Sequence, residues 1–257
     1  MRLTTLGVPL LFAGLVQASF ASTITNGSFD IAGTVFFTVP EATPVVTAAG
    51  TCPANTACIL WQNTTASVND KVDISASGLP NGDLPSAMAG TDAANIFNLM
   101  NPPDGVGAAF APAVFMNFNN AGITTQLLID FIEPGIFSSA GCAATPPAPG
   151  QLCTPTGSPV NFVNLSSRQA SASWVLDGVA DTPGISWTGI FTSQFGTPYQ
   201  TVLEDLAANG FASNTFAATI TLSGTPTTTT VPEPGSMGLT MISLGLIASF
   251  MRRRLAK

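Results

Sequence analysis

The chain has 257 residues, 46% of them hydrophobic and only 8% charged, so it has enough apolar material for a core but must cover its surface mostly with uncharged polar side chains. Between residues 22 and 224, thirteen acidic residues stand against two basic ones, and this charge argues against nucleic-acid binding because it repels phosphate backbones. Histidine is absent, which excludes a Ser-His-Asp triad, a Cys-His dyad and a histidine-ligated zinc site.

The first 21 residues have the pattern of a secretory signal peptide. Arg2 supplies the positive start, an apolar run follows from Leu3 to Val16, and small residues come next. Ser19 and Ala21 form a small-x-small pair, so we expect a signal-peptide helix that is cleaved after Ala21. A retained membrane anchor is the alternative, but the apolar run is short for a span.

Residues 22–224 are predicted to form one mainly β body. Its many turns, with 24 Gly and 20 Pro, favour an antiparallel β-sandwich of jelly-roll type. The opening segment, residues 24–30, is similar to the first strand of many exported jelly-roll domains. Apolar residues alternate with polar ones in four segments, as in half-buried strands, and residues 126–132 are apolar enough for a strand buried on both faces. The alternating apolar positions are Val35, Phe37 and Val39; Ala170, Ala172, Trp174 and Leu176; Ile185, Trp187, Gly189 and Phe191; and Phe216, Ala218, Ile220 and Leu222.

One segment of the body is predicted to be a helix. Tyr199, Val202, Leu203 and Leu206 follow helical spacing, and Gly210 stands where a C-terminal cap belongs. A weaker pattern suggests a second helix over residues 93–100.

Four cysteines lie in the body and should be oxidised in an exported chain. Three pairings are possible. We favour the nearest-neighbour pairs Cys52–Cys58 and Cys142–Cys153, because both intervals are rich in loop-forming residues. No zinc-site spacing is present, and we expect no bound metal or other cofactor.

Acidic and aromatic side chains offer candidate ligand contacts. Asp70 and Asp73, near Asn69 and Asp83, could contribute oxygens to a calcium site, although solvated turn carboxylates are the simpler interpretation. Trp61 lies next to two amide side chains and near a cysteine loop, which suggests an exposed ring for stacking on sugars. Trp174 and Trp187 lie on apolar strand faces and are expected in the core.

Glycoside hydrolysis requires two carboxylates placed across a sugar. Asp130 with Glu133, or Glu204 with Asp205, are the available pairs. No spacing distinguishes either pair from ordinary surface acids. We therefore expect a protein that is not an enzyme and rank a glycan hydrolase last.

The C-terminal end has three parts in order. Residues 225–234 are a Thr/Pro linker that ends in Pro232-Glu233-Pro234, residues 235–251 are apolar, and Arg252, Arg253 and Arg254 open the basic tail 252–257. Seventeen helical residues span roughly 25 Å, at the short limit for crossing a bilayer. Arginine is costly inside hydrocarbon, so the cluster should stop transfer and remain cytoplasmic.

This tripartite end resembles the PEP-CTERM protein-sorting signal. The resemblance covers residues 231–257 and implies recognition by an exosortase, a protease-like transpeptidase in the membrane of Gram-negative bacteria. It also implies cleavage near Pro232-Glu233-Pro234, passage through an inner-membrane intermediate, and transfer of the body to the cell surface or beyond. Proteins of this kind tend to accompany exopolysaccharide and biofilm systems. We therefore expect a structural or adhesive matrix protein, with a carbohydrate- or calcium-binding surface module as the alternative.

Overall fold

The structure is a computed structural model that describes residues 26–63, 70–75, 89–100, 105–118 and 125–224. The predicted signal peptide, the linker with its Pro-Glu-Pro motif, the apolar stretch 235–251 and the basic tail all lie outside the described residues. So do Asn69 and Asp83 of the suggested calcium site.

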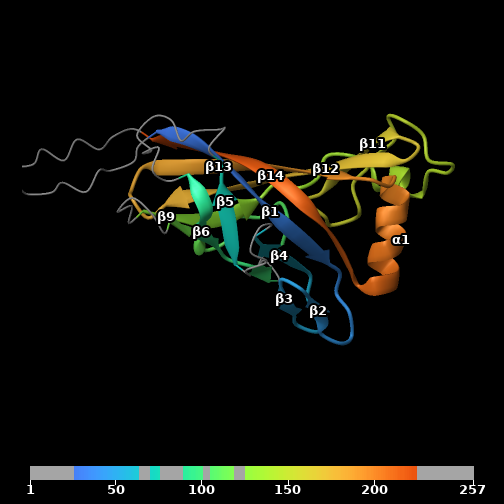
Figure 1. Cartoon of the computed structure of the whole chain (residues 1–257), viewed down its shortest axis with the longest axis horizontal. Helices are drawn as coiled ribbons and strands as arrows, with labels where there is room; N and C mark the ends of the chain where they lie inside the picture. Colours follow the sequence, from blue (N-terminus) through green and yellow to red (C-terminus); the bar gives the residue numbers. More distant parts are fainter. Residues whose placement is uncertain (1–25, 64–69, 76–88, 101–104, 119–124, 225–257) are drawn as a thin grey trace, which may run out of the picture.

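The described chain is mainly β-structure with one α-helix, α1 (Tyr199–Asn209), and one 3-10 turn, η2 (Ser139–Ala143) (Figure 1). Four long strands, β1, β12, β13 and β14, form the centre of a large antiparallel sheet. The strands are β1 (Gly27–Thr38), β2 (Val45–Thr47), β3 (Gly50–Cys52), β4 (Cys58–Gln62), β5 (Lys71–Ile74), β6 (Gly90–Ile96), β7 (Leu99–Met100), β8 (Ala113–Phe118), β9 (Gln126–Ile132), β10 (Leu152–Cys153), β11 (Asn161–Ser166), β12 (Gln169–Ala180), β13 (Ile185–Phe195) and β14 (Phe211–Gly224).

The sheet closes on itself, so the expected jelly-roll sandwich is wrong. Eight strands follow one another in the order β12, β13, β14, β1, β5, β6, β8 and β9, and β9 pairs back to β12. A sandwich would have two separate sheets with open edges, whereas the pairing of β9 with β12 makes this body a closed eight-strand barrel.

Closure of the barrel depends on one close approach between β9 and β12. At Gly178 in β12, a Cβ atom would lie 1.9 Å from the carbonyl oxygen of Leu128 and 2.6 Å from Nε1 of Trp187. Because glycine leaves this space free, the Trp187 indole can donate a 2.9 Å hydrogen bond to Leu128 O. The register also shifts between Asp177 and Gly178, so Asp130 is an extra residue in β9.

The barrel interior is filled by the inward faces of its strands, as the alternation predicts. Two segments differ from expectation. Residues 126–132 bury only one face fully, because β9 is part of the barrel wall. Residues 93–100 are not helical but lie mostly in β6 and β7, where pairing with neighbouring strands overrides a weak helical pattern. The predicted inward positions that are buried include Val35, Trp174, Leu176, Trp187, Phe191, Phe216, Ala218, Ile220 and Leu222.

A second, smaller core lies beyond the barrel, between α1 and the first halves of β11 and β12. Tyr199 and Val202 pack there with Phe162 and Phe195. The predicted helix is confirmed, and Gly210 caps it in the left-handed conformation with φ 75° and donates to Leu206 O.

Both predicted disulfides are present. Cys52–Cys58 links β3 to β4 in a third small cluster, and Cys142–Cys153 ties η2 to β10.

The two ends of the described chain lie together at one pole. Gly27 pairs with Leu222, and Gly224 N donates to Asn26 Oδ1 at 3.4 Å. Helix α1 lies at the opposite pole (Figure 1). β14 joins the two poles with 14 residues, a length of about 45 Å at the usual rise per residue.

Candidate functional site

The long strands change partners as they leave the barrel, and this change opens a cleft. The first half of β1 pairs with β5, but its second half pairs with β4. In the same way β12 pairs with β9 in its second half and with β11 in its first half. Among the described strands, β4 and β11 do not pair with each other. The α1 pole is therefore open where the other end is closed.

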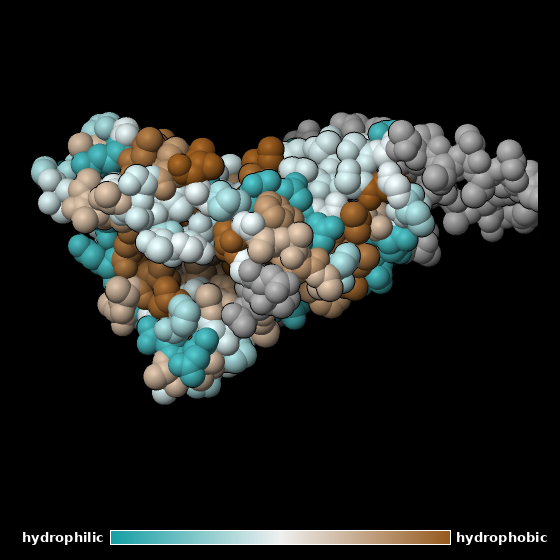
Figure 2. Space-filling model, turned by 180° about the vertical axis from the view of Figure 1, so that it is seen from behind, coloured by the Kyte–Doolittle hydropathy of each residue, from teal (hydrophilic) through white to brown (hydrophobic). Residues whose placement is uncertain are grey.

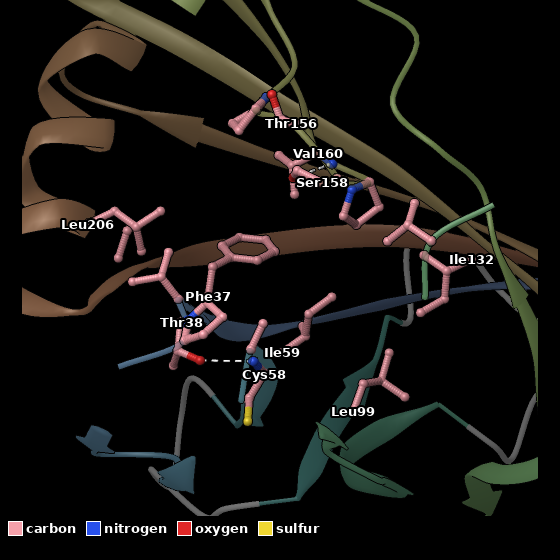
Figure 3. Close-up of a pocket in the computed structure, with 18 of the residues that line it drawn as sticks. Phe37, Thr38, Cys58, Ile59, Leu99, Ile132, Thr156, Ser158, Val160 and Leu206 are labelled. Atoms are coloured by element: carbon pink, nitrogen blue, oxygen red, sulfur yellow. Dashed lines mark hydrogen bonds between the residues drawn. The ribbon is translucent and has the colours of Figure 1, made fainter. Parts of the chain in front are cut away.

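This opening is a cleft of about 400 Å³ between the barrel core and the second core. Seen from behind, the molecule has two arms, and hydrophobic surface lies in the hollow between them (Figure 2). Leu206 points into the cleft from α1, Leu99 and Ile59 enter from below, and Val160 lies above (Figure 3). Phe37 of β1 contacts both cores and forms part of the floor.

None of the described residues that line the cleft is charged. Its two more enclosed hydroxyl groups are occupied within the protein: Thr38 Oγ1 accepts from Cys58 N at 2.8 Å and donates to Cys52 Sγ at 3.1 Å, and Ser158 Oγ accepts from Val160 N at 3.0 Å. Thr156 is exposed at the rim. The cleft thus presents mainly hydrocarbon to a ligand.

A buried amide network holds the α1 side of the cleft in place. Asn164 donates to Gln200 Oε1 at 2.9 Å and to Gln151 Oε1 at 3.1 Å, while its own oxygen accepts from Tyr199 N at 2.9 Å. The Tyr199 hydroxyl donates to Gly141 O at 2.8 Å, and burial raises the pKa of this phenol. These bonds fix α1 against the loop closed by Cys142–Cys153, so this wall is preformed.

Trp61, the suggested sugar platform, is fully buried, so the prediction of an exposed ring is wrong. In β4 it pairs with Val35 and faces the barrel interior. Its ring lies 5.0 Å from Phe216 and 5.4 Å from Phe191, centroid to centroid. The amide side chain of Gln62 does not indicate exposure of Trp61, because a strand places adjacent side chains on opposite faces, and Asn63 is itself buried.

Asp70 lies in the turn before β5, and Asp73 lies in β5. Asp70 has φ 57° and is largely exposed, but the partial desolvation of its carboxyl raises its pKa. Asp73 Oδ1 accepts from Asn63 Nδ2 at 2.5 Å and from Asp92 N at 3.0 Å. No group of three or more acidic or cysteine side chains suited to a metal occurs in the ranges that the structure describes. Calcium binding at these positions stays an untested prediction.

The acidic residues that the fold does bring together differ from the predicted pairs. Asp130, the extra residue in β9, lies near Asp177 of β12. Desolvation and then the negative charge of Asp177 raise the pKa of Asp130. Asp177 also accepts a 2.6 Å hydrogen bond from Thr188. Glu204 and Asp205 are exposed on α1. The proximity of Asp130 to Asp177 depends on the β9–β12 register, which no local spacing reveals.

Comparison with known proteins bears on the C-terminal end of the chain. The family model of the PEP-CTERM protein-sorting motif matches residues 230–254. The chain carries a PEP-CTERM sorting motif. The match contains Pro232, Glu233 and Pro234, the apolar stretch and the arginine cluster, so the predicted resemblance is confirmed. No curated protein and no solved structure matches the chain.

The PEP-CTERM motif supports export of the body through the membrane to the cell envelope and exosortase-dependent processing, with the membrane as the anchoring site. Across the described segments, no helix combines the length and apolarity needed to cross a membrane. The predicted span 235–251 is not among those segments.

Proposed function

We propose that this protein is a non-enzymatic surface protein with a structural or adhesive role in an exopolysaccharide or biofilm matrix. The match of the PEP-CTERM motif to residues 230–254 carries the proposal, because it supports sorting of the body to the envelope. The two disulfides fit a protein built to persist in an oxidising exterior.

The outer faces of β13 and β14 support the adhesive part of the proposal. Their outward side chains are mostly hydroxyl groups, and cross-strand neighbours such as Thr188 and Thr221, or Ser186 and Ser223, form regular rows. A hydroxyl both donates and accepts hydrogen bonds, as do the hydroxyls of a polysaccharide. An uncharged polar face of this kind suits many weak contacts along a glycan chain.

The position of the chain ends supports display from the envelope. Gly224, after which the sorting region follows, lies at the pole opposite α1. A tether attached there would hold the cleft and the α1 pole away from the membrane, at a distance set by the roughly 45 Å of β14.

Sorting is tested by replacing both Pro232 and Pro234 with Ala in the full chain. We expect an uncut, membrane-retained form of higher mass, whereas Pro226→Ala in the same linker should be processed like the wild type. Equal mass and fractionation for all three proteins would show that the tail is an anchor without processing.

The matrix role is tested separately by mixing the sorted protein with exopolysaccharide from the producing cells. We expect co-sedimentation of protein and polysaccharide, and no new reducing ends on prolonged incubation. Release of reducing ends would replace the structural role by hydrolysis, and protein that stays in solution would contradict adhesion.

A further inference from the structure

We propose that the cleft between β4 and β11 binds an uncharged molecule through a hydrocarbon chain of about a dozen carbons. The cleft lies in the described body, and its proposed ligand does not depend on the matrix role. The cleft measures about 400 Å³, and a methylene group occupies roughly the 30 Å³ of a water molecule in the liquid. Cavities of this size hold small ligands.

The chemistry of the lining selects an aliphatic ligand. Ile59, Leu99 and Leu206 enter from three different elements, and the floor is formed by Phe37. The enclosed hydroxyls of Thr38 and Ser158 already have partners within the chain. A polar ligand would lose its hydrogen bonds to water here and gain few in return, whereas a hydrocarbon chain loses none.

Charge further restricts the ligand to a neutral molecule. Among the residues that the structure describes, no basic side chain lines the cleft to neutralise an anionic headgroup. Residues 22–224 carry thirteen acidic and two basic side chains, so the field of the body repels carboxylates and phosphates. A neutral alcohol or ester therefore fits better than a fatty acid or a phospholipid.

Two other occupants fit the structure less well. A second copy of this chain would carry the same negative charge, and a stable pair buries about 800 Å² on each partner, a flat area rather than a concave cleft. The chain's own apolar stretch 235–251 belongs to the PEP-CTERM match, which implies membrane anchoring followed by exosortase processing. A segment with that role is either in the bilayer or removed, so it fits the cleft less well than a separate molecule.

The proposal is tested with photoreactive 1-dodecanol carrying a diazirine, added to envelopes of cells that produce the full chain. After irradiation, labelled peptides are located by mass spectrometry. We expect label on the peptides that contain Ile59 and Leu206. Ala57→Trp, which places a large ring in the cleft, should reduce this label at least tenfold. Ala217→Trp on the exposed face of β14 is the matched control and should leave it unchanged.

A second variant keeps the test decisive if the tryptophan disturbs folding. Thr156→Asp adds a charge at the exposed rim without touching either core, and it should also reduce cleft labelling severalfold. Photoreactive dodecanoate should label the cleft at least tenfold less than the alcohol. Any one of four results would overturn the proposal. These are equal labelling of wild type and both cleft variants, label confined to residues 235–251, cross-links between two copies through the cleft, and equal labelling by the carboxylate and the alcohol.

Discussion

Gly178→Ala should open the barrel at its seam. The added methyl group would stand 1.9 Å from Leu128 O, and such contacts in folded proteins are essentially never closer than 3.0 Å, so β9 must move away from β12 by about 1 Å. Neither group near the added methyl can move easily, because Leu128 O belongs to the backbone and Trp187 Nε1 belongs to a buried indole.

The expected cost has two parts. Moving Leu128 O breaks its 2.9 Å hydrogen bond with Trp187 Nε1, and a buried donor left without a partner costs about 1–3 kcal/mol. Overpacking the seam costs about 1–3 kcal/mol more. The free energy of unfolding should therefore fall by at least about 2 kcal/mol, which corresponds to a Tm lower by roughly 4–8 °C for a domain of this size.

Urea unfolding followed by tryptophan fluorescence measures this loss, with Gly196→Ala as the control. A Cβ at Gly196 would meet nothing within 4 Å, so that variant should change stability by less than about 1 kcal/mol. Trp187→Phe removes the indole donor in advance, so Gly178→Ala should cost less in that background. If Gly178→Ala and Gly196→Ala unfold at the same urea concentration, the closed barrel is incorrect.

Three further measurements probe other parts of the structure. Replacing both Cys142 and Cys153 by Ser should lower the free energy of unfolding by about 3 kcal/mol, and the shorter Cys52–Cys58 ring should contribute about 2 kcal/mol, as measured by denaturation of each double variant. Trp61→Ala should cost about 3–5 kcal/mol because it empties space in the barrel core; a variant as stable as the wild type would place the ring at the surface. Asp130→Asn should gain stability relative to the wild type as pH rises above 3.8, the ordinary pKa of its carboxyl. The folded carboxyl holds its proton to higher pH than the unfolded one. The stabilising contribution of the wild-type carboxyl is therefore complete below pH 3.8 and is lost as pH rises through the raised pKa. The amide of the variant does not titrate, so the variant loses nothing over this range. Parallel pH profiles in thermal melts would contradict the environment assigned to Asp130.

The strands and the helix could be predicted because their signals are local. Phe216, Ala218, Ile220 and Leu222 alternate with polar residues, and the structure buries all four. Gly210 follows an apolar helical stripe, and the helix ends there. The cysteine pairing was predictable for the same reason, since each ring is short and lies in a loop-rich interval. In each case the deciding residues are close together in the sequence.

The closed barrel and the cleft could not be predicted, because both depend on pairing between distant segments. Nothing near Gly178 indicates that its missing side chain admits the carbonyl of Leu128, fifty residues earlier. The same holds for Trp61, whose burial follows from pairing with Val35. Phe37 was assigned to a strand face, but its place between two cores appears only once β1 is seen to exchange β5 for β4.

Long strands explain why the two ends of this molecule differ. A barrel whose strands all had equal length would close at both ends, whereas β1 and β12–β14 extend past the ring. The outer two of these four strands, β1 and β12, pair with new partners there. Those partners, β4 and β11, leave the cleft between them, and the chain ends leave the body at the closed pole. Because the two poles are about 45 Å apart, variants at Pro232 and Pro234 should change where the protein is held without changing cleft labelling, and Ala57→Trp should do the reverse.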